Sequence, residues 1–282
     1  MQNDGISVII STYDDPIDFV SQCINSLLFQ EKIYEIIVVD SSKKEDIKKF
    51  CNSLENRKIN YVYTPPKGMS DARNKGMSIA KKNIVAFTDA DCIVDKNWAK
   101  NIFFPFEIGN DIAIVGGKVL PKWISKPNNI LYNSAIAQGF YSSFDMGEEI
   151  KEVHQIFGGN FAINRSLVAD QFFSTELGRG KGNLLGGEET QLCKKVEMKK
   201  LKIIYNPLAV VLHQIPEERS KFKWMWKRMY YGGINRIIVG GMPTPKTVNF
   251  VSYNLYDIIF LMIFISPYIY GLLKAKFMQI SK

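Results

Sequence analysis

The stretch IVAFTDADC, residues 84–92, joins an apolar run to two acids, Asp89 and Asp91, that stand one residue apart. A short apolar run bounded by polar residues predicts a buried strand. Carboxylates at the end of such a strand are costly unless a positive partner meets them, and a divalent cation that carries a substrate diphosphate is such a partner. The alternative is a turn with two solvated acids. Because the acids follow an apolar strand within an alternating α/β segment, we favour the cation site.

Strand and helix patterns alternate around this stretch through the first hundred residues. The expected strands cover residues 6–11, 34–40, 60–63 and 84–88, and the expected helices cover residues 16–28, 41–54 and 70–80. This order predicts a parallel sheet with helices on both faces. Ligands of such sheets bind beyond the carboxyl ends of the strands. We therefore expect Ser11, Asp40 and Asp89, which lie at strand ends, to converge.

Two residues of this region have alternative interpretations. Asp40 could accept a hydrogen bond from a base or a ribose, or it could cap the following helix. Arg73 lies near a helix start and could face a phosphate or an acid of the Asp-x-Asp motif, or it could lie on the surface. Each segment by itself leaves both alternatives open.

The second half of the chain is less regular. A strand is expected at residues 112–117, loops and short helices at 121–155, a glycine-opened strand at 156–165, a loop running into a helix at 184–196, and two short strands at 201–214. The glycine pair Gly158–Gly159 and the following Asn160 would let the backbone approach a sugar or an acceptor closely. A plain bulge or turn is the alternative.

Composition excludes several classes of protein. The chain has 282 residues, 46% of them hydrophobic, and a net charge of +8. The basic excess suits an anionic partner but does not identify it. Four scattered cysteines without a Cys-x-x-Cys motif indicate reduced thiols and no zinc knuckle. We expect no secretory signal, because the N-terminus leads directly into a strand. We also expect no nucleic-acid partner, because no binding module surrounds the basic residues.

Six motifs together resemble one enzyme family. SVIISTYDDP, IIVVDSS, GMSDARNKGMSIA, IVAFTDADC, FGGNFAINR and GGEETQLCKKV occur in the order typical of family 2 glycosyltransferases, from about Ile6 to His213. The resemblance implies the α/β GT-A fold, with a mostly parallel, Rossmann-like nucleotide-binding sheet fused to an acceptor-binding half. It also implies inverting transfer of a sugar from a nucleotide-diphosphate-sugar donor, with Mn²⁺ or Mg²⁺ as cofactor.

The resemblance assigns roles on the donor side. Ser11 and Tyr13 resemble the segment that meets the nucleobase, and Asp40 resembles the acid at the base edge. Asp91 resembles the direct metal ligand, and Asp89 resembles the acid nearer the ribose, although both are candidate ligands. Arg73 remains a candidate for the nucleotide-sugar site.

On the acceptor side the resemblance points to a carboxylate base. The family usually has Glu-Asp where this chain has Glu188-Glu189, so Glu189 stands at the position of the general base and Glu188 remains a second choice. Favourable charge at a helix N-terminus is the alternative. His213 corresponds to a histidine that meets the metal or diphosphate in some relatives, and a structural histidine is the alternative. Gly159 and Asn160 are the candidates for contact with the sugar or acceptor.

The last part of the chain changes character. Lys and Arg alternate with Trp and Tyr at residues 221–231, and residues 258–273 carry no charge. Because sixteen residues fall short of a full span and Pro267 and Gly271 interrupt them, we expect an interfacial or re-entrant helix. Extending the stretch through residues 251–256 would make a full span feasible. A helical hairpin packed on the protein, or a homodimer interface, is the alternative.

The expected organisation follows from these segments. Residues 1–218 form the GT-A domain, with a nucleotide-sugar half at 1–115 and an acceptor half at 116–218, and residues 219–282 form a helical, membrane-associating extension. The expected place is the cytoplasmic, inner face of the cell membrane, with a glycan or lipid-linked acceptor. A nucleotidyltransferase and a non-catalytic scaffold are the alternatives. The absence of a glycine- and arginine-rich loop in STYDDP argues against the first, and the intact acid set argues against the second.

Overall fold

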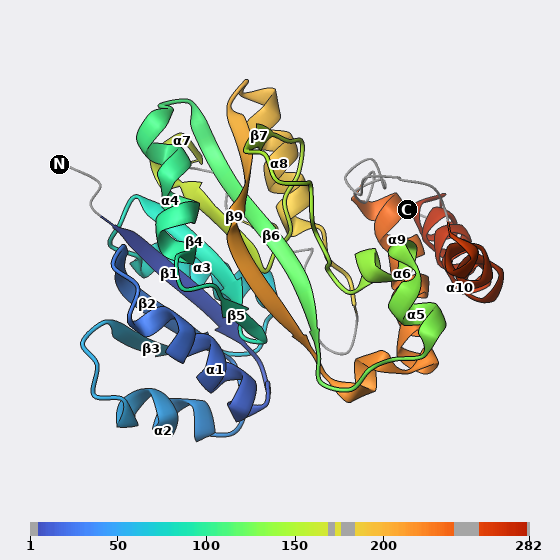
Figure 1. Ribbon diagram of the computed structural model, residues 1–282, viewed down its shortest axis with the longest axis horizontal. Helices are drawn as coiled ribbons and strands as arrows, with labels where there is room; N and C mark the ends of the chain where they lie inside the picture. Colours follow the sequence, from blue (N-terminus) through green and yellow to red (C-terminus); the bar gives the residue numbers. More distant parts are fainter. Residues whose placement is uncertain (1–4, 169–172, 176–183, 240–253, 281–282) are drawn as a thin grey trace.

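The computed structural model describes residues 5–168, 173–175, 184–239 and 254–280 and shows an α/β fold built on one twisted sheet (Figure 1). The strand order along the sheet is β3-β2-β1-β4-β8-β6-β9-β5, and β7 also pairs with β9. The strands are β1 (Ile6–Thr12), β2 (Ile33–Asp40), β3 (Ile59–Tyr63), β4 (Ile84–Asp89), β5 (Cys92–Val94), β6 (Ile112–Trp123), β7 (Lys151–Glu152), β8 (Asn160–Asn164) and β9 (Lys202–Ile215).

The parallel half of the sheet is the part that the alternating pattern predicts. Strands β3, β2, β1 and β4 run parallel to one another, whereas β8 runs antiparallel between β4 and β6. Strands β6 and β9 are again parallel. The boundary expected after residue 115 falls inside β6, so the two halves share one continuous sheet.

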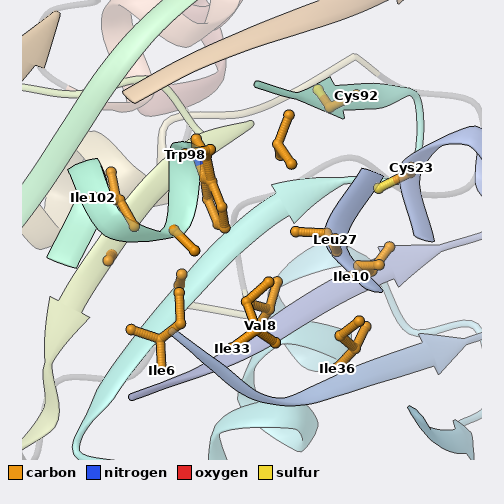
Figure 2. Packing of buried hydrophobic residues seen from close by; sticks show 14 of the residues in the cluster. Ile6, Val8, Ile10, Cys23, Leu27, Ile33, Ile36, Cys92, Trp98 and Ile102 are labelled. Atoms are coloured by element: carbon orange, nitrogen blue, oxygen red, sulfur yellow. The ribbon is translucent and has the colours of Figure 1, made fainter. Parts of the chain in front are cut away.

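Helices cover both faces of the sheet. One face carries α1 (Ile17–Leu28), α2 (Asp46–Ser53) and α4 (Trp98–Ile108), and the other carries α3 (Met69–Ile79), α7 (Arg165–Val168) and α8 (Glu188–Met198). Figure 2 shows part of the first core, which includes Trp98 and Ile102 of α4, Leu27 of α1 and Val8 of β1. Each buried strand contributes side chains to both cores, because successive residues point to opposite faces of the sheet.

Strand β9 corrects one prediction. We expected two short strands at 201–214, but a single strand runs from Lys202 to Ile215. Its pairing with β6 shifts between Gly117 and Lys118, where Asn206 and then Val210 are the partners. Pro207 lies in this irregularity, as expected for a residue that has no N–H to donate to a ladder. The second part of β9 pairs with β5, so the shift brings His213 opposite Cys92.

A separate group of helices packs beyond one end of the sheet, at the right of Figure 1. It contains α5 (Asn129–Asn133), α6 (Ala135–Phe140), α9 (Phe222–Ile238) and α10 (Leu255–Ile280), and the 3₁₀ turn η1 (Glu217–Ser220) leads into α9. A third apolar cluster, which includes Met225, Met229, Phe260 and Phe264, holds these helices together.

Helix α10 is longer than the sequence suggested. It continues through Pro267 and Gly271, which we expected to interrupt it. Residues 255–278 form the one helix in the described part of the chain that is long and apolar enough to cross a membrane, and only 28% of its most apolar window is buried. Residues 251–253, through which the apolar stretch could extend, lie outside the described residues.

Candidate active site

The carboxyl ends of the central strands converge as the alternating pattern predicts. In the parallel ladders Ser11 pairs with Val39 on one side and with Asp89 on the other, and Thr12 pairs with Asp40. Ser11, Asp40 and Asp89 therefore lie on three neighbouring strands at one edge of the sheet. This edge is where parallel α/β sheets bind ligands.

Arg73 is the centre of a buried ion cluster at this edge. Its Nη2 donates to Asp89 Oδ1 (3.2 Å), and its Nη1 donates to Glu188 Oε1 (3.1 Å) and Glu189 Oε1 (2.6 Å). The side chain is 2% exposed, so the surface alternative for Arg73 is wrong and the alternative in which it faces an acid of the Asp-x-Asp motif holds. Contact of Arg73 with a nucleotide sugar stays a prediction. Burial would lower the pKa of the guanidinium, but the surrounding carboxylates, Glu189 first, outweigh it and raise the pKa.

The glycine pair before β8 lies against the same carboxylates. The Gly158 carbonyl accepts a hydrogen bond from Arg73 Nη2 (3.0 Å). A Cβ atom on Gly158 would lie 1.8 Å from Glu189 Oε1, and one on Gly159 would lie 3.1 Å from Asp89 Oδ2. The absence of side chains at these two positions therefore leaves room for the carboxylates of Asp89 and Glu189.

Asp91 takes part in a second polar cluster. Its Oδ2 lies 3.3 Å from His213 Nε2 and accepts a hydrogen bond from Arg219 Nη1 (3.1 Å). Arg219 Nη1 also lies 3.3 Å from His213 Nε2, and His213 Nδ1 lies 3.0 Å from the carbonyl oxygen of Tyr141. The structure thus brings Asp91 and His213 together, while Asp89 is turned toward Arg73.

Two residues of the second cluster were missed in the sequence. Arg219 stands at the start of the extension, two residues before the basic and aromatic segment, and Asp15 stands in the loop after β1. Neither has a local signal beyond its residue type. Asp15 Oδ2 accepts hydrogen bonds from Thr12 Oγ1 (3.0 Å) and the Tyr13 amide (3.1 Å). Burial, and next the nearby charge of Asp91, raise the pKa of Asp15 to about 6.

The residues expected at the nucleobase have differing surroundings. Tyr13 is 50% exposed, whereas the buried hydroxyl oxygen of Ser11 has no hydrogen-bond partner among the described residues. Asp40 is fully buried and accepts hydrogen bonds from the Ser42 amide (2.8 Å) and Tyr61 Oη (2.9 Å). Because the next helix begins only at Asp46, Asp40 is not its cap. Contact of Ser11, Tyr13 and Asp40 with a base stays a prediction.

The side chain of Asn160 does not face the cluster. It is fully buried, accepts from Trp98 Nε1 (2.7 Å), and donates to the carbonyl oxygens of Lys118 (2.9 Å) and Ala209 (2.7 Å). These three bonds join β8 to α4, β6 and β9. The Asn160 side chain therefore has a structural role, and the contact of Gly159 and Asn160 with a sugar or acceptor stays a prediction.

Helix α9 contacts the loop that leads to Glu188. Arg228 Nη1 donates to the Leu184 carbonyl (3.2 Å), and Asn235 Oδ1 accepts from the Gly186 amide (3.4 Å). Arg228 is 7% exposed, so it is a structural contact and not one of the lipid-facing basic residues that the sequence suggested. The helical extension thus helps to set the position of the N-terminus of α8, which carries both candidate bases.

The donor atoms at Asp91 and His213 suit a divalent cation. A carboxylate oxygen and an imidazole nitrogen approach to 3.3 Å, and a positively charged guanidinium contacts both. Within the described ranges, no group of three or more His, Cys, Asp or Glu side chains is arranged to hold a metal. Ions such as Mg²⁺ commonly use one or two protein ligands and complete their shell with substrate phosphates and water. Asp91 and His213 therefore fit a cation that is shared with a bound diphosphate.

Carboxylates at the carboxyl edge of the sheet, near two glutamates at a helix start, agree with the GT-A class of transferases. The chain belongs to glycosyl transferase family 2, whose family model matches residues 7–172. It is 25% identical over 251 residues to a glucosyl-dolichyl phosphate glucuronosyltransferase of Haloferax volcanii, covering 83% of this chain and 77% of the relative. It is 27% identical over 182 residues to a hyaluronan synthase of Pasteurella multocida, covering 62% of this chain but 18% of the relative.

Solved structures agree on the fold. A mannosyltransferase from Pyrobaculum calidifontis in complex with GDP-Man and Mn²⁺ has a TM-score of 0.59 and 17% identity, over 96% of this chain and 72% of that one. GalNAc-T7 with UDP, GalNAc and Mn²⁺ also has a TM-score of 0.59, at 16% identity, over 83% of this chain and 50% of that one. The expected fold class and enzyme class are confirmed, and the nucleotidyltransferase and scaffold alternatives gain no support.

Proposed function

We propose that this enzyme transfers a sugar from a nucleotide-diphosphate-sugar donor to an acceptor hydroxyl with inversion at the anomeric carbon. The observation that carries the proposal is the Arg73 cluster, which links Asp89 at the donor edge to Glu188 and Glu189 at the start of α8. One guanidinium thereby joins the protein carboxylate proposed for the donor side to the two proposed for the acceptor side in one buried cluster. Such fixed geometry is what a bimolecular transfer between two bound substrates needs.

In this proposal Asp91 and His213 hold a Mn²⁺ or Mg²⁺ ion, and Asp89 remains a second candidate ligand. When bound, the ion supplies positive charge against the negative charge that develops on the leaving diphosphate. Asp91 and His213 both contact the Arg219 guanidinium, and this attraction of positive charge supports the proposal. Arg73 and Arg219 add two further positive charges on the donor side.

Glu189 is the proposed general base. Its side chain is 14% exposed, compared with 3% for that of Glu188, so Glu189 is the more accessible of the pair. A base must lie within hydrogen-bond reach of the acceptor hydroxyl and must accept its proton while the oxygen attacks. Arg73 orients the Glu189 carboxylate, and Gly158 leaves the room in which it lies.

We propose a lipid-linked or surface-glycan acceptor and a position on the inner face of the cell membrane. The first support is the relative that acts on a dolichyl phosphate-linked sugar. The second is an apolar stripe on the exposed side of α10, which we call the outer stripe: Leu255, Ile258, Met262, Ile265, Ile269 and Leu273. Because Phe260 and Phe264 pack α10 against the protein, the outer stripe suits a helix lying in the plane of the membrane.

The proposal is tested by donor binding. Nucleoside diphosphates and nucleotide sugars are screened by thermal shift with and without Mn²⁺, because a ligand of the native state raises the melting temperature. We expect one base to be selected and its effect to depend on Mn²⁺. Asp91→Asn should remove the Mn²⁺-dependent part of the shift. Full Mn²⁺-dependent donor affinity in Asp91→Asn would contradict the metal assignment, and no binding by any nucleotide sugar would contradict the function.

A further inference from the structure

Arg219 occupies the place between the two proposed ligand atoms. Its Nη1 lies 3.1 Å from Asp91 Oδ2 and 3.3 Å from His213 Nε2, and these two atoms are 3.3 Å apart. The three atoms therefore form a nearly equilateral triangle. One nitrogen of a permanently charged side chain contacts both atoms that would bind a divalent ion.

The state of His213 can be assigned from its partners. Its Nδ1 lies 3.0 Å from the Tyr141 carbonyl oxygen, which can only accept, so Nδ1 carries the proton. In the neutral ring with this tautomer, Nε2 has the lone pair and lies where it can accept from Arg219 Nη1. A carbonyl that orients a histidine in this way is also the usual support of a metal-ligating imidazole. The ring is therefore already set to offer Nε2 to a cation.

A guanidinium and a divalent ion cannot use the same two atoms together. The guanidinium has only donors and carries a charge of the same sign as the ion. We infer that Arg219 is an internal competing cation, which fills the Asp91–His213 pair and which a divalent ion must displace. This inference rests on the metal use in the proposed function and adds a regulation of that site.

The position of Arg219 in the fold gives the exchange a structural consequence. Arg219 belongs to η1, which leads into α9, and its carbonyl oxygen accepts a hydrogen bond from Tyr141 Oη (3.0 Å). The Tyr141 ring stacks on Trp224 of α9 at 5.2 Å between centroids. Displacement of the Arg219 side chain therefore removes one of the contacts that join the extension to the donor site. The backbone contact to Tyr141 remains.

Competition makes a direct prediction for binding of the metal alone. Arg219→Gln should bind Mn²⁺ more tightly than the wild type in the absence of nucleotide, by roughly 5- to 150-fold, the usual range for coupling between two ligands. The matched control is Lys221→Gln, which removes one positive charge two residues away. Lys221 is exposed and pairs with Glu217 at 3.5 Å. The Mn²⁺ affinity of the Lys221→Gln variant should stay within about twofold of that of the wild type.

The experiment is calorimetric titration of the full chain with Mn²⁺, after melting curves in a chelator have shown that each variant is folded. Arg219→Lys keeps the charge and should bind Mn²⁺ nearly as weakly as the wild type. A folded Arg219→Gln that binds Mn²⁺ no more tightly than the wild type overturns the inference. If wild type and variants bind Mn²⁺ neither alone nor with a nucleotide sugar, the metal in the proposed function fails as well.

A second measurement needs no variant. Hydrogen exchange of the wild-type backbone around residues 217–224 is followed with and without Mn²⁺. Release of the Arg219 side chain should speed exchange there, while the strands β1, β2 and β3 serve as an internal reference. Unchanged or slower exchange at saturating Mn²⁺ contradicts displacement even if Arg219→Gln fails to fold.

Discussion

At the scale of single residues, the site depends on one arginine that serves several acids. Arg73 contacts Asp89, Glu188 and Glu189 while it is almost completely buried. Removing one partner of a buried charge group is strongly destabilising, because it leaves an uncompensated charge. Substitutions of the acids therefore change both chemistry and stability, and each test needs a binding readout beside activity.

Glu189→Gln should lower kcat by about 10²- to 10⁴-fold, the usual contribution of a general base, while donor affinity stays near that of the wild type. The amide keeps the size of the side chain but cannot take the acceptor proton. Steady-state kinetics and calorimetric donor binding check the two parts. Glu188→Gln is the matched variant, since Glu188 also contacts Arg73. If Glu188→Gln loses turnover and Glu189→Gln does not, Glu188 is the base.

Asp15→Asn should stabilise the metal-free protein at pH 7.5 by about 1–2 kcal/mol. Asp15 has a folded-state pKa of about 6, above its ordinary value of 3.8. The folded state thus binds the extra proton between these values. The stability of the wild type therefore falls as the pH rises from about 3.8 through about 6, and the full cost of the ionised carboxylate is present above about 6. A two-unit shift corresponds to about 3 kcal/mol, reduced here because the side chain is partly exposed.

The check is thermal melting of wild type and Asp15→Asn in a chelator at pH 7.5 and pH 4.5. The gain of the variant should be clearly smaller at the lower pH, where the wild-type carboxyl is protonated in the folded state, and it should vanish only below the ordinary pKa of 3.8. An equal stability gain at both pH values, or a loss of stability at pH 7.5, would show that the ionised carboxylate of Asp15 does not destabilise the folded protein.

At the scale of elements, the crossing of α9 and α10 depends on glycines. A Cβ on Gly271 would lie 2.1 Å from the Tyr230 carbonyl oxygen, and one on Gly233 would lie 2.0 Å from the Tyr268 carbonyl oxygen. The two backbones therefore touch directly. Small residues permit such close approach of helices. Gly271 therefore marks a helix contact and not the end of a helix.

Gly271→Ala should destabilise the protein by about 1–3 kcal/mol, because the helices must separate to admit the methyl group. Gly139→Ala in α6 is the control, since no atom lies within 4 Å of an added Cβ there. Helix propensity alone would make the control neutral or more stable by up to about 1 kcal/mol. Denaturant unfolding measures both. Equal stability of the two variants would disprove the direct backbone contact.

At the scale of the whole molecule, a stripe of exposed apolar side chains lies on α10, at one end of the protein. The outer stripe of α10 follows a spacing of three and four residues along one helix face, and exposed lysines lie on the neighbouring α9. Apolar side chains beside basic residues suit an anionic membrane surface. Within the described residues, the opposite end of the sheet carries the start of β1 and has no comparable helix (Figure 1).

The double variant Met262→Ser/Ile269→Ser should lose at least about tenfold in binding to anionic phosphatidylglycerol vesicles. Each buried aliphatic side chain contributes about 1.5–3 kcal/mol, and both residues are exposed in the protein, so the fold should tolerate the change. Phe29→Ser, at 89% exposed after α1, is the control and should bind as the wild type does. Co-sedimentation measures both. Vesicle binding that does not change in the double variant removes the outer stripe from the membrane contact.

Local patterns by themselves determined the parallel half of the sheet and the meeting of Ser11, Asp40 and Asp89, because buried strands have a two-residue period and parallel strands end at one edge. They left open whether Arg73 lies on the surface or beside the Asp-x-Asp motif, and the buried contact with Asp89 was decided by the tertiary structure. Only the tertiary structure decided that Asn160 bonds to Trp98, 62 residues away, and that Arg219 meets Asp91, 128 residues away. An amide or a guanidinium has the same local pattern on a surface, in a core or at a ligand site. Its role is decided by the partners that folding brings to it, and those partners are remote in the chain.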